Sequence, residues 1–257
     1  MLDLNWVNEA LNNYIRPHTF PIAAKMCRST DELPEKTKLP WRDLKIKIPL
    51  CQGISMVRRY GWTIAIGKED ESCPFGALTL GFVPAKKGYL DGTAYKLTTK
   101  EAATKTAKAR SRLEYGKYAY LLVAPVQKAV FEPDLIIVYG NPAQVGRLIQ
   151  ATLLHRGSAL TTPSTGGVAC SSIIARTINE DECQYVVAGA GERMFALTQD
   201  DEMAFTMPRS KVEITIKSLE ESHKSGEARY PTLSYLRFEP KFPDSFYKLM
   251  DYLEKDE

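Results

Sequence analysis

The sequence predicts an α/β or α+β protein in which two similar halves pack as one globular domain. Segments typical of strands alternate with segments typical of helices, which favours this class over an all-β fold. The chain of 257 residues can bury a sizeable core, and its 44% hydrophobic and 25% charged residues are typical of a globular protein. Fourteen positions separate Arg59 from Cys73 and also Arg156 from Cys170, so one offset of 97 relates the two pairs. We interpret this repeat as a degenerate internal duplication.

The predicted halves cover about residues 18–115 and 116–208 of this single domain. A helix over residues 1–17 precedes them, because its apolar residues share one helical face before Pro17 stops it. A C-terminal extension over residues 209–257 follows them. Its helices are expected to begin near Ser210 and Asp244, and the second to turn an apolar face inward, formed by Phe246, Leu249, Met250 and Leu253.

Local patterns predict the elements of the first half. We expect strands over residues 20–27, 44–48 and 62–66, a short helix over 51–60 that Gly61 ends, and a basic surface helix from about 98 to 115. Thr98 and Glu101 fit a capping box at the start of that basic helix. A lone Lys25 in the first strand either meets a partner or ligand, or marks the exposed end of the strand.

The second half repeats this alternation. We expect strands over residues 118–126, 135–139, 184–188 and 203–207, and a helix over residues 142–156. Asn141 and Pro142 are strong signals for the start of this helix, and Gly157 for its end. Ile173 and Ile174 indicate a short helix or strand. The run Gly189 to Arg193 reads as a tight glycine turn.

Charge and composition argue against some classes of function. The 34 basic and 31 acidic residues leave a net charge of +3, which predicts no strong attraction to nucleic acid or to a membrane surface. No apolar run approaches the roughly 18 residues that span a bilayer, and the N-terminus lacks the pattern of a signal peptide. We therefore expect a cytoplasmic protein. No arrangement of nucleophile, histidine and acid can be assembled from the three histidines, His18, His155 and His223.

The five cysteines are expected to be reduced thiols rather than a disulfide framework. Cys51, Cys73 and Cys170 each lie at an element boundary, whereas Cys27 ends an apolar strand and Cys183 lies in an acidic loop. If the two halves are related by a pseudo-twofold axis, Cys73 and Cys170 converge at their interface, with Cys51 nearby. A helix N-terminus lowers the pKa of a thiol and favours the thiolate that binds metals.

Three soft ligands and an open position suit an iron–sulfur cluster or, as the second choice, zinc. Histidine is scarce, which favours the cluster. No Cys-x-x-Cys pair supports a metal site, so structural or redox thiols remain an alternative interpretation.

Several spaced motifs resemble the family named domain of unknown function 169. They are Phe20 to Lys25, Leu50-Cys51-Gln52, Cys73-Pro74 with Gly76-Ala77, Pro133-Asp134 leading to Gly140 to Gln144, Cys170, and Gly191-Glu192-Arg193. The resemblance covers roughly residues 18–208 and implies a protein of archaea and anaerobic bacteria whose activity stays open. It also implies that a ligand site draws on the motif residues Lys25, Gln52, Gln144, Glu192 and Arg193.

Two hypotheses of function follow. The first is a metal- or cluster-dependent enzyme, or a redox or accessory protein of anaerobic metabolism, with Lys25 and Arg193 near a substrate. The second is a non-catalytic module that binds a small anionic ligand in the same cleft. In either case we expect the protein to bind a small molecule or another protein, and a homo-oligomer is also compatible with the sequence. We expect it to bind neither nucleic acid nor a membrane.

Overall fold

A computed structural model gives the structure of the protein and describes residues 2–93, 99–165, 169–226, 229–231 and 241–255. Its centre is a six-stranded sheet of order β2-β3-β1-β4-β6-β5, in which every neighbouring pair is antiparallel. The strands are β1 (Ile22–Cys27), β2 (Ile64–Gly67), β3 (Tyr120–Pro125), β4 (Leu135–Gly140), β5 (Gln184–Val187) and β6 (Met203–Pro208). The α-helices are α1 (Leu4–Tyr14), α2 (Leu50–Tyr60), α3 (Pro74–Thr79), α4 (Lys87–Leu90), α5 (Lys100–Ala109), α6 (Pro142–Arg156), α7 (Thr177–Glu180), α8 (Ala190–Ala196), α9 (Arg209–Ser225) and α10 (Asp244–Glu254). The mixed α/β class is therefore confirmed.

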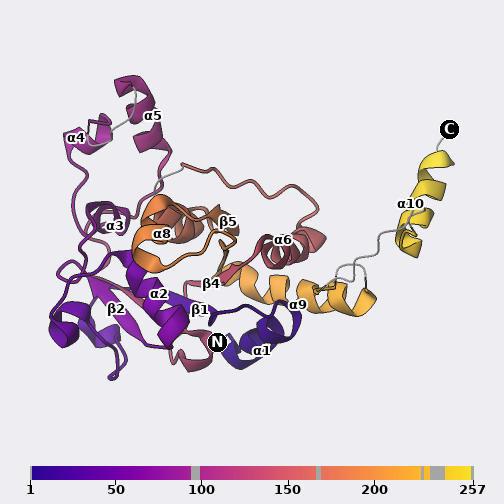
Figure 1. Ribbon diagram of the computed structural model, residues 1–257, viewed down its shortest axis with the longest axis horizontal. Coiled ribbons are helices and arrows are strands. Elements are labelled where there is room, and N and C mark those ends of the chain that lie inside the picture. The colour runs from indigo at the N-terminus through magenta and orange to yellow at the C-terminus, as the bar shows by residue number, and fades with distance from the viewer. Residues whose placement is uncertain (1, 94–98, 166–168, 227–228, 232–240, 256–257) are drawn as a thin grey trace.

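Helices cover both faces of the sheet (Figure 1). On one face α2, α3 and a π-helical segment, Ser171–Arg176, bury their apolar side chains against strand residues such as Ile137. On the other face α1, α6 and α9 pack against the alternate strand residues, including Ile136. This follows from the period of two in a strand, which sends successive side chains to opposite faces.

The helix α6 shows how closely local sequence can define an element. The Asn141 side chain accepts a hydrogen bond from the Gln144 backbone N–H (2.9 Å), and the Gln144 side chain accepts one from the Asn141 N–H (2.8 Å). Together they form a capping box with Pro142 at the first helical position. Gly157 ends the helix at φ +66°, a conformation that suits glycine. The start and end predicted from these residues are confirmed.

The proposed duplication is not confirmed. The strand β2 lies between Arg59 and Cys73, whereas the described residues between Arg156 and Cys170 contain no strand. The structure does show a likeness in strand order, because β1-β3-β2 and β4-β6-β5 lie on the two sides of the central β1/β4 pair. In that correspondence β2 leads to α3 as β5 leads to α8, so Cys73 corresponds to Gly189 rather than to Cys170. The boundary between the halves stays a prediction.

Two local predictions in the body of the protein were wrong. Residues 44–48 do not form a strand, because Pro40–Leu44 is a π-helical turn and Lys45 adopts a left-handed conformation at φ +58°. The Asp43 carboxylate stabilises this turn by accepting a hydrogen bond from the Leu39 N–H (2.8 Å). The predicted glycine turn at residues 189–193 is instead the first part of α8.

The start of α5 also differs from the prediction. Thr99 is its N-cap and accepts a hydrogen bond from the Ala102 N–H, while Thr98 lies outside the described residues. The helix ends at Ala109, earlier than expected.

The C-terminal extension divides into two different parts. The helix α9 belongs to the core, because Val212, Ile216 and Leu219 are fully buried. The helix α10 stands apart from the body in Figure 1, and its apolar residues are exposed. The prediction that Phe246, Leu249, Met250 and Leu253 face inward was wrong. None of the described helices is long and apolar enough to cross a membrane.

Candidate functional site

The three boundary cysteines line one cavity. Its volume is about 170 Å³, and its wall is mostly apolar. Cys51 lies in the first turn of α2, Cys73 is the N-cap of α3, and Cys170 precedes the π-helical segment. The lining residues are Pro49, Leu50, Cys51, Cys73, Phe75, Gly76, Ala169, Cys170, Gly189, Gly191, Glu192 and Phe195. The fold thus brings together three thiols from three separate segments of the chain.

Glu71 joins the two helix starts that carry Cys51 and Cys73. Its carboxylate accepts hydrogen bonds from the Leu50 N–H (3.0 Å) and the Cys73 N–H (2.7 Å), which are unpaired within their own helices. A Cβ at Gly76 would lie 2.5 Å from one Glu71 oxygen, so only glycine leaves room for this carboxylate. Burial raises the pKa of Glu71 to about 7, although the backbone hydrogen bonds oppose this change.

Cys51 and Cys170 do not have the lowered pKa expected of thiols at helix starts. Burial raises the pKa of Cys51 to about 12, and the nearby Glu192 and Cys73 act in the same direction. Burial also raises the pKa of Cys170, although that residue as a whole keeps some exposed surface. Desolvation therefore outweighs the helix dipole, and Cys51 and Cys170 are protonated at neutral pH.

The side chains are not arranged as a ready metal site. Within the described part of the chain, no group of three or more histidine, cysteine, aspartate or glutamate side chains is placed to hold one metal ion. The three cysteines nevertheless line the wall of one cavity.

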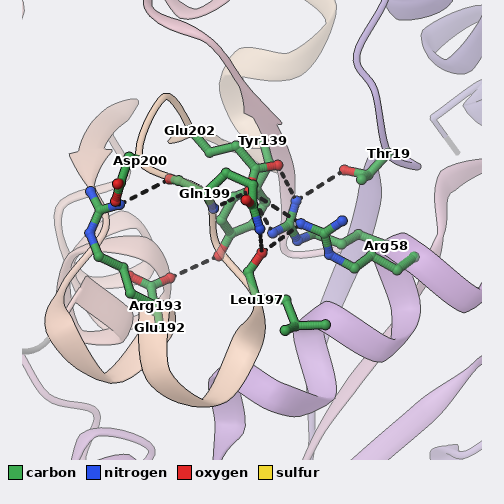
Figure 2. Close-up of polar contacts among 10 residues, drawn as sticks. Thr19, Arg58, Tyr139, Glu192, Arg193, Leu197, Gln199, Asp200 and Glu202 are labelled. Carbon is green, nitrogen blue, oxygen red and sulfur yellow. Dashed lines mark hydrogen bonds and ion pairs between the residues drawn. The ribbon is translucent and has the colours of Figure 1, made fainter.

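Glu192 is the acidic residue of the cavity wall. It is 4% exposed, and burial raises its pKa. One carboxylate oxygen accepts a hydrogen bond from the Gly189 N–H (3.1 Å) at the start of α8, and the other accepts one from the Tyr139 hydroxyl (3.0 Å). Figure 2 shows this carboxylate beside Tyr139.

Behind Tyr139 lies a buried ion pair. The Arg58 guanidinium stacks on the Tyr139 ring, 4.3 Å from its centroid, and donates two hydrogen bonds to Glu202 (2.6 and 3.0 Å), as Figure 2 shows. Arg58 is 1% exposed and Glu202 13%. This network fixes α2 and α8 against the sheet, and through Tyr139 it positions Glu192.

The residues expected to bind a ligand are dispersed, with the exception of Glu192. Lys25 lies on β1 on the sheet face opposite the cavity and pairs with Glu32 (3.1 Å). Arg193 pairs with the exposed Asp200 (2.6 Å), and Figure 2 shows it reaching toward that residue. Gln52 is half-buried on α2 outside the cavity wall, and Gln144 caps α6.

The remaining cysteines lie elsewhere. Cys183 is buried among the side chains of α1, α6 and α9, and Cys27 is buried in a small cluster with Ala65 and Leu122. Neither lines the cavity. They therefore serve as matched controls for experiments on Cys51, Cys73 and Cys170.

Glu71, Tyr139 and Arg58 were missed by the sequence interpretation. The backbone donors that hold Glu71 could not be recognised from residue spacing. The Arg58-Arg59 pair gave a partial signal, because one of two adjacent arginines on a short amphipathic helix must lie nearer the core. Glu202, the ion-pair partner of Arg58, is distant in sequence, and no sequence signal pointed to it.

Fold and cavity define a mixed α/β protein with a cysteine-lined pocket. The chain belongs to the DUF169 family, described as "Uncharacterised ArCR", whose profile matches residues 10–218. It is also similar to the uncharacterised protein MJ0308 of Methanocaldococcus jannaschii, with 25% identity over 205 residues, which is 77% of this chain and 86% of the relative. No solved structure matches the chain.

Proposed function

We propose that this protein binds an iron–sulfur cluster, with zinc as the second choice, through Cys51, Cys73 and Cys170. In this proposal it acts as an enzyme or as a redox or accessory protein of anaerobic metabolism. The observation that carries the proposal is the meeting of these three cysteines on one cavity wall, while Cys27 and Cys183 lie elsewhere.

The side chains that line the cavity suit a metal centre that prefers sulfur ligands. Thiolates are preferred ligands of iron–sulfur clusters and of zinc, and no histidine lines this cavity. Three cysteines leave one coordination position for a substrate, for water or for the Glu192 carboxylate. Because Cys51 and Cys170 are protonated in the free protein, metal binding would release their protons.

The second candidate, a module that binds a small anion in this same cavity, has less support. Glu192 is acidic, and its neighbours Leu50, Phe75 and Phe195 offer no positive charge. Lys25 and Arg193, which were expected near a substrate, pair with Glu32 and Asp200 and do not line the cavity.

Metal analysis of cysteine variants tests the proposal. Protein purified or reconstituted without oxygen should contain iron and sulfide, or zinc. Cys51→Ser, Cys73→Ser and Cys170→Ser should each lose most of that metal, because serine has a similar shape but is a poor ligand for soft metals. Iron, sulfide and zinc per chain are the measured quantities, with thermal unfolding as the check on folding.

Cys183→Ser and Cys27→Ser are the controls and should keep the metal content of the unmodified protein. A colourless, metal-free protein with five titratable thiols after anaerobic reconstitution would refute the proposal. Equal metal loss in Cys183→Ser would also contradict it, because that residue lies outside the cavity.

A further inference from the structure

A second hollow lies at the other end of α2, the helix that begins beside the cysteine-lined cavity. Its volume is about 370 Å³, and its wall is more polar than that of the cysteine cavity. Asn12, His18, Thr19, Arg58 and Arg59 supply its polar side chains. We call this hollow the arginine cleft.

The arginines of the cleft outnumber their acidic partners. Both Arg58 and Arg59 pair with the same carboxylate, that of Glu202, at 2.6 and 3.3 Å. Among the described residues, no other acid pairs with either arginine within ion-pair distance. Two guanidinium charges therefore share one carboxylate charge, and a net positive charge remains at the wall of the cleft.

The cleft also has hydrogen-bond donors that a ligand could use. The Arg59 Nε–H is buried, and in the described structure it has no acceptor. The Thr19 hydroxyl accepts a hydrogen bond from Arg58 (3.3 Å), so its own proton stays available to a ligand. A buried donor without an acceptor is costly, and an oxyanion supplies several acceptors at once.

Two carbonyls at the C-terminal end of α2 already have donors other than Arg58 and Arg59. The carbonyl of Arg58 accepts the Phe20 N–H (2.9 Å), and that of Gly61 accepts the Lys128 ammonium group (2.8 Å). These two carbonyls therefore accept hydrogen bonds from groups other than the two guanidinium groups. Lys128 adds a further positive charge next to the cleft.

We propose that the arginine cleft binds the phosphate or carboxylate group of a small anionic ligand. Arg59 provides the main contact, because its guanidinium is a quarter exposed and can donate to a bound oxyanion. Arg58 is held rigidly by Glu202 and Tyr139 and fixes the floor of the cleft. This site is separate from the cysteine cavity, so it does not depend on the proposed metal binding.

Calorimetric titration of the full chain tests this site. Inorganic phosphate and malonate serve as separate probes at constant ionic strength, and chloride serves as the reference anion. Saturable binding of phosphate alone would identify a phosphate site, and binding of malonate alone a carboxylate site. Arg59→Gln should weaken binding by about tenfold or more, because it removes a charge-assisted contact, and Arg59→Lys should weaken it less.

Two controls separate this site from other effects. Arg193→Gln removes a half-buried arginine outside the cleft and should bind the anion normally. Cys170→Ser should also bind it normally, whether or not that variant loses metal. Binding of phosphate and malonate no tighter than that of chloride would overturn the proposal. Normal binding by Arg59→Gln would overturn it too.

Discussion

Replacing Arg58 with alanine is expected to lower the free energy of unfolding by about 3 to 5 kcal/mol. The substitution leaves the Glu202 carboxylate, which is 13% exposed, without its bidentate partner, and it removes the stacking contact with Tyr139. Urea unfolding followed by circular dichroism measures the loss. Arg193→Ala is the matched control, because it breaks an ion pair with the fully exposed Asp200 and should cost less than about 1 kcal/mol.

The same ion pair has a predictable dependence on pH. Burial alone would raise the pKa of Glu202, but the hydrogen bonds from Arg58 and from the Gln199 N–H lower it below its usual value. A carboxylate with a lowered pKa stabilises the fold above its unfolded pKa, and this stability is lost as the pH falls through the folded pKa. The difference in stability between the unmodified protein and Arg58→Ala should therefore shrink in acid. A loss below about 1 kcal/mol at neutral pH, or a difference that does not change in acid, would contradict this account.

Elements with strong local signals could be predicted from the sequence. Asn141, Pro142 and Gly157 define the ends of α6 by their own chemistry, whatever the rest of the chain does. The apolar runs at β1, β3 and β4 mark strands for the same reason. The order of those strands could not be predicted, because β3 enters the sheet between β1 and β2 through pairing of residues far apart in the chain.

The start of α8 shows how tertiary contacts override local propensity. Glycine disfavours helix, so Gly189 and Gly191 suggested a turn. The Glu192 side chain reverses that preference by accepting the Gly189 N–H and the Tyr139 hydroxyl. Gly189 is close to Glu192 in the sequence, whereas Tyr139 lies on the distant strand β4. The sequence pattern could therefore indicate only the first of these two contacts that stabilise the start of α8.

The sequence could predict which cysteines line the cavity, but it could not predict whether their thiols are ionised. Placement at element boundaries selected Cys51, Cys73 and Cys170, and these line the same cavity. The helix-start argument predicted thiolates, yet a sequence does not show how much water reaches each sulfur. Burial decides the pKa of Cys51, and it acts in the opposite direction.

Replacing Gln144 with alanine is expected to lower the free energy of unfolding by about 2 to 4 kcal/mol. Gln144 is 1% exposed, and its amide group donates to the carbonyls of Ile15 (3.1 Å) and Arg16 (2.7 Å). Its side-chain oxygen accepts the Asn141 N–H. The substitution therefore leaves three backbone groups without partners, each costing about 1 kcal/mol or more, and opens a small void.

This prediction separates a structural role for Gln144 from the ligand role that the family resemblance implies. Arg16 adopts φ +56°, and the hydrogen bond from Gln144 to its carbonyl helps to hold that turn between α1 and β1. Gln52→Ala is the matched control, because Gln52 is a half-buried glutamine on α2 and belongs to the same set of motif residues. It should change stability by less than about 0.5 kcal/mol. If Gln144→Ala unfolds at the same urea concentration as the unmodified protein, the capping network does not stabilise the fold, and a ligand role for Gln144 becomes the better explanation.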